Sequence, residues 1–178
     1  MTGDTVGKLR LTAMDGEVFD LDALKGKRFM LSFFRFAACP FCNLRLHELV
    51  RRFDEFGDGF TIVAIFDSPL DNLAHYAGRH RPPFPVLADP HNIYYREYAI
   101  ERSIVGMLKG ALLRLPQAMY GVFAKAYVPL SIQGRLTTLP ADFLVDETGV
   151  IRRAYYGSDV GDHLPFERVE EFSRGWDA

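Results

Sequence analysis

The sequence predicts a single α/β domain over residues 1–178, with a central mixed sheet flanked by helices. Short apolar runs of strand length alternate with helically spaced apolar residues, and this alternation requires crossover connections and a partly parallel sheet. A length of 178 residues suits one domain. With 48% hydrophobic and 25% charged residues, the composition excludes disordered, collagen-like and disulfide-stapled classes.

The first part of the chain supplies most of the expected sheet. Residues 9–21 fit a hairpin around a glycine turn at the sheet's border. The nearly continuous apolar runs 29–34 and 60–66 predict strands covered on both faces. Between them, apolar residues at three-to-four spacing predict a helix that starts near Pro40 and stops before Gly57.

The remaining elements continue this alternation. We expect a helix to about Gly78, a short strand over 84–88, and a brief helix after Pro90. Residues 141–156 fit a second hairpin, and a final helix follows Pro165.

An inserted helical segment is expected at about residues 102–135. It is strongly apolar, Pro116 divides it into two plausible amphipathic helices, and its charged residues are all basic. No apolar stretch approaches the ~20 residues of a membrane span. A cationic amphipathic helix can lie on a membrane or dock a partner. We instead expect its apolar faces to cover the sheet or a homodimer interface.

The charge balance gives little reason to expect a polyanionic partner. The net charge is −2 and the pI is near 6.2, so nucleic acid is not expected as a partner. The first residues lack the pattern of a secretory signal, and we therefore expect a cytoplasmic protein.

The chain has two cysteines, Cys39 and Cys42, placed where a strand turns into a helix. Backbone N–H groups and the helix dipole at that position favour the thiolate of Cys39, which makes it the candidate nucleophile. Cys42 lies one helical turn further on and is suited to resolving a mixed disulfide. Pro40 fits the first helical position.

The CxxC turn has two other interpretations. A structural zinc site needs four ligands, and His47 lies too far along the helix to join the pair, so neither metal nor cofactor is expected. Two inert buried thiols would require this spacing and location to arise by accident. The 157–163 stretch has metal-ligating residue types without ligand spacing, and a solvated loop is expected there.

The sequence resembles the thioredoxin superfamily, specifically its peroxiredoxin-like AhpC/TSA branch with a CxxC. The stretches that carry the resemblance are residues 33–45 and 139–152. It implies a thioredoxin-like fold in which Pro140 is a cis-proline facing the CxxC. The backbone of Leu139 would then be free to pair with an extended substrate segment. A plain strand-edge proline is the alternative.

The chain departs from the pattern of several relatives. Typical peroxiredoxins carry a proline seven residues and a hydroxyl residue three residues before the cysteine, where this chain has Ser32 and Phe36. Pro140 also stands where they carry an arginine, and these losses weaken a peroxidase interpretation. Ala38 and Phe33 replace the aromatic residue and buried acid of plain thioredoxins. The glutathione motifs of glutaredoxins are missing.

Two arginines are candidates to stabilise the thiolate. Arg35 ends the strand before Cys39, and Arg45 lies one turn beyond Cys42. Each is equally compatible with a solvated surface cation.

Together these features predict a thiol-disulfide oxidoreductase that uses Cys39 and Cys42. Its partners would be a disulfide-bearing protein or small thiol substrate and an external dithiol reductant. One alternative is a thiol peroxidase in which Cys39 is peroxidatic and Cys42 resolving. Another is a non-enzymatic, redox-responsive binding module that docks through residues 102–135.

Overall fold

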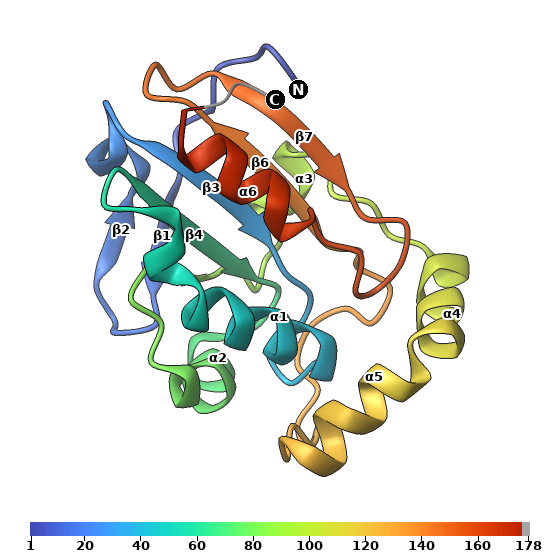
Figure 1. Ribbon diagram of the computed structural model, residues 1–178. Coiled ribbons are helices and arrows are strands. Elements are labelled where there is room, and N and C mark those ends of the chain that lie inside the picture. The colour runs from blue at the N-terminus through green and yellow to red at the C-terminus, as the bar shows by residue number, and fades with distance from the viewer. Residues whose placement is uncertain (176–178) are drawn as a thin grey trace.

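The structure, a computed structural model, describes residues 1–175 and contains one mixed sheet (Figure 1). Over these residues the sheet has seven strands in the order β2-β1-β5-β4-β3-β6-β7. The strands are β1 (Arg10–Ala13), β2 (Val18–Asp20), β3 (Arg28–Phe33), β4 (Phe60–Phe66), β5 (Val86–Ala88), β6 (Ala141–Val145) and β7 (Ile151–Tyr156).

The strand pairing confirms the expected mixed sheet. β3, β4 and β5 run parallel at its centre, whereas β6 pairs with β3 in the antiparallel sense. The predicted hairpin of β1 and β2 lies at one edge, and the hairpin of β6 and β7 lies at the other. The parallel pairs require crossovers, which the helices between them supply.

Helices cover both faces of this sheet. The α-helices are α1 (Pro40–Arg51), α2 (Leu70–Ala77), α3 (Ile93–Glu97), α4 (Ile104–Leu113), α5 (Leu115–Met119) and α6 (Phe166–Ser173). In Figure 1, α1, α2 and α6 lie in front of the sheet, while α3 lies behind it.

The alternation of side chains along β3 explains why most of its residues are apolar. Met30 packs into the core under α1, α2 and α6, whereas Leu31 and Phe33 pack into the core on the opposite face with Tyr95 of α3. A strand buried on both faces has no position for a solvated side chain. Its last residues therefore place the following turn at the end of a rigid central element.

The inserted segment runs from residue 104 to residue 136, and we call it the covering segment. It begins and ends at a short antiparallel bridge, in which Ser103 donates to the carbonyl of Thr137 and Arg102 pairs with Thr138. It contains α4, α5 and the π-helical turn η4 (Tyr120–Ala124), with the division near Pro116 as expected.

The large apolar side chains of the covering segment do not cover the sheet, so that part of the expectation was wrong, and coverage by a second copy stays a prediction. Leu112 is 76% exposed and Phe123 is 79% exposed, because glycines occupy the inward face of these helices. In Figure 1, α4 and α5 project from the body of the protein. Within residues 1–175, the helices are too short or too polar to cross a membrane.

Candidate active site

The turn after β3 is built around the start of α1. Cys39 is the N-cap residue of α1, and Pro40 is the first residue of the helix, as predicted. The amide of Asn43 donates to the carbonyl of Ala37 at 2.7 Å and to the carbonyl of Cys39 at 2.9 Å. This side chain fixes the turn by donating hydrogen bonds to two of its carbonyls. The sequence alone does not distinguish it from an asparagine on the surface, because its role depends on its burial in the fold.

The two sulfurs are free thiols, and each cysteine is only 1% exposed. Burial alone would raise the pKa of Cys39. The hydrogen bond from the Cys42 side chain, the charge of Arg35 and nearby backbone N–H groups outweigh it and lower this pKa to about 6. Burial and the neighbouring Cys39 raise the pKa of Cys42. The pair therefore holds one thiolate and one thiol at neutral pH.

Arg35 is held against the nucleophilic sulfur by two backbone carbonyls. Its Nη1 lies 3.2 Å from the Sγ of Cys39, its Nε donates to the carbonyl of Thr138 at 2.9 Å, and Nη2 donates to the carbonyl of Leu136. Arg35 is only 4% exposed, so it is not a solvated surface cation. A cation held this way stabilises the thiolate without changing position.

Arg45 serves a different part of the structure. Its Nη2 donates to the carbonyl of Leu164 at 2.7 Å, and its guanidinium lies 3.9 Å from the ring centroid of Phe166. Burial lowers its pKa, and the nearby carboxylate of Asp142 opposes that shift. Arg45 is not among the groups that lower the pKa of Cys39, so the structure brings only Arg35 to the sulfur.

The segment before β6 differs from the expectation. No peptide bond in the described residues is cis, so the bond before Pro140 is trans and the cis-proline prediction was wrong. The N–H of Leu139 donates to the carbonyl of Glu101 at 3.0 Å, so it is not free for a substrate strand. The residues just before the inserted segment, Glu101 and Arg102, occupy this backbone edge.

The covering segment lies over the CxxC turn. A Cβ at Gly121 would lie 3.2 Å from Leu44 Cδ1 and 3.4 Å from Pro40 Cβ, and one at Gly134 would lie 2.8 Å from Phe36 Cβ. Gly134 has a φ of 131°, so its conformation and close contact favour glycine, and a side chain at Gly121 would require its neighbours to shift. The covering segment thus packs against residues on either side of Cys39 in the chain, while both cysteines belong to the core cluster that includes Met30 and Leu46.

The comparison with known protein families identifies the family of this chain. Residues 2–154 match the AhpC/TSA family. The chain belongs to the AhpC/TSA family. Among curated protein sequences, none matches it.

Solved structures share the fold of this AhpC/TSA protein at low sequence identity. The peroxidoxin BcpB from Mycobacterium tuberculosis has a TM-score of 0.69 and 17% identity, with 99% of this chain and 98% of that chain covered. A thioredoxin-family thiol:disulfide interchange protein from Chlorobium tepidum has a TM-score of 0.58 and 21% identity, with 98% of this chain and 99% of that chain covered. A mutant of peroxiredoxin 6 from Arenicola marina has a TM-score of 0.71 and 11% identity, with 98% of this chain and 72% of that chain covered. The thioredoxin-like fold is thereby confirmed.

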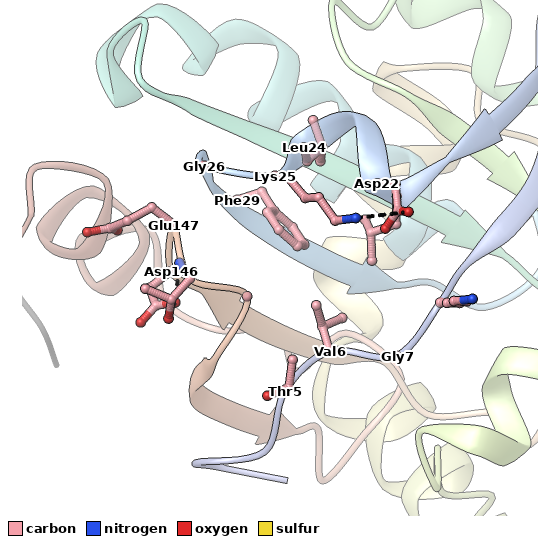
Figure 2. Close-up of a pocket in the computed structure, with 14 residues that line it drawn as sticks. Thr5, Val6, Gly7, Asp22, Leu24, Lys25, Gly26, Phe29, Asp146 and Glu147 are labelled. Atoms are coloured by element: carbon pink, nitrogen blue, oxygen red, sulfur yellow. Dashed lines mark hydrogen bonds and ion pairs between the residues drawn. The ribbon is translucent and has the colours of Figure 1, made fainter.

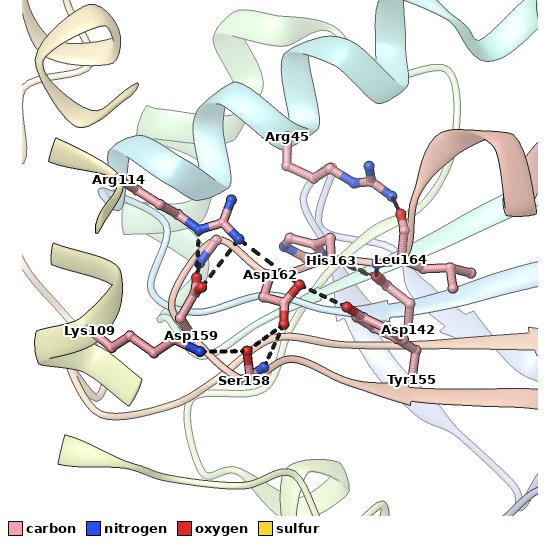
Figure 3. Close-up of polar contacts among 11 residues, drawn as sticks. Arg45, Lys109, Arg114, Asp142, Tyr155, Ser158, Asp159, Asp162, His163 and Leu164 are labelled. Carbon is pink, nitrogen blue, oxygen red and sulfur yellow. Dashed lines mark hydrogen bonds and ion pairs between the residues drawn. The ribbon is translucent and has the colours of Figure 1, made fainter. Parts of the chain in front are cut away.

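The loop of residues 157–164 connects the covering segment to the sheet (Figure 3). Nε of Arg114 lies 2.7 Å from Oδ1 of Asp159, and Nζ of Lys109 lies 3.3 Å from Oγ of Ser158. Asp159 is buried, so this loop is not the solvated turn that was expected. Over the described residues, no group of three or more side chains could hold a metal ion.

Asp142 is a buried carboxylate that sequence reasoning missed. It accepts hydrogen bonds from Ser32 Oγ at 2.5 Å and from the Leu164 N–H at 2.7 Å, and His163 Nδ1 lies 3.1 Å away. Burial would raise its pKa, but His163, Arg45 and Ser32 lower it to about 2. An ionised carboxylate therefore ties β6 to the loop that contacts the covering segment.

Two cavities differ in their relation to the cysteines of this AhpC/TSA protein. One of about 300 Å³ lies between α1 and the covering segment and is bordered by Phe41, Arg45, Tyr120 and His163. The other, of about 180 Å³, lies around Phe29 at the opposite end of β3 (Figure 2). Only the first cavity includes a residue of the CxxC turn.

Proposed function

We propose that this AhpC/TSA protein is a thiol-disulfide oxidoreductase in which Cys39 attacks a substrate disulfide and Cys42 resolves the product. The observation that carries the proposal is the position of Cys39 at the N-cap of α1 with Arg35 Nη1 3.2 Å from its sulfur, which lowers the pKa of Cys39 while burial raises that of Cys42. A thiolate is the attacking species in disulfide exchange, and a neighbouring thiol retains its proton until the second step.

The reaction proceeds in two exchanges. The Cys39 thiolate attacks one sulfur of the substrate disulfide, a Cys39–substrate bond forms, and the other substrate sulfur leaves as a thiolate. Cys42 gives its proton to that leaving thiolate and attacks Cys39 Sγ, which releases the second substrate sulfur. The substrate gains two electrons, and Cys39–Cys42 becomes a disulfide. An external dithiol then reduces this disulfide and is itself oxidised.

Cys39 is only 1% exposed, so a substrate can reach its sulfur only if neighbouring residues move, and the covering segment packs next to them. Its η4 turn packs on Pro40, and the carbonyls that hold Arg35 come from Leu136 at its end and from Thr138 just after it. A cavity includes Phe41 of the CxxC turn and is bordered by Tyr120 of the same segment. Substrate binding between α1 and this segment would uncover the sulfur and leave Arg35 anchored at Thr138.

A trapping experiment tests this function. Cys42→Ser should accumulate mixed disulfides between Cys39 and proteins that carry a disulfide, because the resolving sulfur is missing. Cys39→Ser should form none, and serves as the matched control. An empty trap with Cys42→Ser, together with no reduction of a model protein disulfide by the wild type, would contradict the proposal. A binding module without enzymatic activity would show redox-dependent association alone.

Peroxide reduction is a second candidate, which the placement of Arg35 favours. A guanidinium donor 3.2 Å from Cys39 Sγ could polarise a peroxide, although Phe36 leaves no hydroxyl at the position expected in peroxiredoxins. Cys39 would become a sulfenic acid as the peroxide is reduced to water, and Cys42 would condense with it to release a second water. Rapid peroxide consumption with a dithiol reductant, lost in Cys39→Ser, would establish this activity instead.

A further inference from the structure

The outer face of the covering segment is a continuous row of large apolar side chains. These residues are spaced three or four apart along α4, α5 and η4, a spacing that places neighbours within one helix on the same side. All of them are exposed: Val105, Leu108, Leu112, Leu115, Met119 and Phe123. Soluble proteins seldom expose a contiguous apolar surface of this kind without a partner for it.

The glycine side of the same helices faces the protein. A Cβ at Gly106 would lie 3.1 Å from Leu139 Cδ2, and one at Gly110 would lie 2.9 Å from the backbone nitrogen of Val160. These close contacts fix which side of the segment is buried, so rotation cannot hide the apolar row. The row is therefore a fixed feature of the surface.

The charge of this region is opposite to that of the rest of the protein. Residues 102–135 hold five of the chain's 21 lysines and arginines and none of its 23 acidic residues. The remainder of the chain is accordingly acidic. Two copies joined symmetrically through this segment would bring like charges together, which argues against self-association as its purpose.

We propose that the covering segment docks the protein on an anionic lipid bilayer, with the apolar row inserted in the plane of the membrane interface. The row lies on helices that project from the body, a shape that suits a flat, deformable surface better than a protein groove (Figure 1). The excess of basic over acidic residues in 102–135 supplies attraction to acidic headgroups. No helix in residues 1–175 could span the bilayer, so the contact is peripheral.

Vesicle co-sedimentation tests this docking directly. The probe is a set of vesicles of phosphatidylglycerol and phosphatidylcholine in equal parts, compared with vesicles of phosphatidylcholine alone. The wild type should partition onto the anionic vesicles, and added salt should weaken binding because it screens the basic residues. Leu112→Asp combined with Phe123→Asp should weaken partitioning by about tenfold or more, since both changes place charge in the inserted row.

A matched control separates this effect from added charge in general. Val18 on β2 is also exposed, at 56%, and lies outside the covering segment, so Val18→Asp should leave partitioning unchanged. Equal binding by the double variant, or no binding by the wild type, would overturn the proposal. Size-exclusion chromatography with light scattering completes the test: a wild-type oligomer that the double variant converts to a monomer, without vesicle binding, would assign the row to self-association.

Discussion

The CxxC turn buries a charged side chain, whereas the covering segment exposes apolar ones. In the turn, a charged arginine is buried beside the sulfur because the carbonyls of Leu136 and Thr138 accept its hydrogen bonds. In the covering segment, large apolar side chains face outward because glycines take the inward positions. The two regions touch, so the chemistry of the first depends on the packing of the second. Local residue type alone does not say which side of an element is buried.

The largest effect is expected from a change on the glycine side of α4. Gly110→Leu would place a side chain against the backbone of Val160 and lift the covering segment. Overpacking costs about 1–3 kcal/mol, which corresponds to an increase of up to about 100-fold in the alkylation rate of Cys39. Mass spectrometry after timed iodoacetamide treatment measures that rate.

The control places the same residue one position further along the helix. Ala111 is exposed, and Ala111→Leu should leave alkylation at the wild-type rate. Circular dichroism verifies that both variants remain folded. If Gly110→Leu alkylates no faster than Ala111→Leu, the covering segment does not control access to the sulfur.

The next effect concerns Asp142, which ties the sheet to the 157–164 loop. Its pKa of about 2 is below the ordinary value near 3.9, so the ionised form stabilises the folded protein above about pH 4. This contribution is lost as the pH falls through about 2. Asp142→Asn should therefore lower the free energy of unfolding by about 2 kcal/mol at pH 7. Urea unfolding at pH 7 and pH 3 should show the difference between the two proteins shrinking by about half. An equal difference at both pH values would mean that the ionised carboxylate is not what stabilises the fold.

A smaller effect distinguishes the two arginines near α1. Arg35 lowers the pKa of Cys39, so Arg35→Met should raise it from about 6 by about one unit. The thiolate fraction at pH 6 would then fall about fivefold. The ultraviolet absorbance of the thiolate, titrated against pH, reports this change without requiring access to the sulfur.

Arg45→Met is the comparison for this measurement. Arg45 contacts Leu164 and Phe166, and we expect its loss to leave the titration of Cys39 unchanged. A similar shift in both variants would show that general electrostatics, and not the specific contact of Arg35, sets the thiolate pKa.

The sequence was informative where structure follows from local pattern. Alternating strands and helices, the hairpins, and the start of α1 at Pro40 could all be predicted, because apolar periodicity and proline at a helix start are local signals. The choice between Arg35 and Arg45 could not, because it depends on carbonyls about a hundred residues away in the chain. Leu139 was misjudged for the same reason, since its N–H is taken by Glu101. The glycine spacing of Gly106 and Gly110 was the available signal for the buried side of α4.

The smallest effect tests the ion pair that joins the two regions. Arg114 is partly exposed and Asp159 is nearly buried, and their Nε–Oδ1 distance is 2.7 Å. Partly exposed pairs of this kind contribute about 1 kcal/mol, and Arg114→Gln also leaves a buried carboxylate without its cation. We expect alkylation of Cys39 to become about fivefold faster. Arg168→Gln removes an exposed pair with Glu171 on α6 and should change nothing. If the two variants behave alike, the covering segment is held by its glycine contacts alone, and the 157–164 loop does not take part in controlling access to the sulfur.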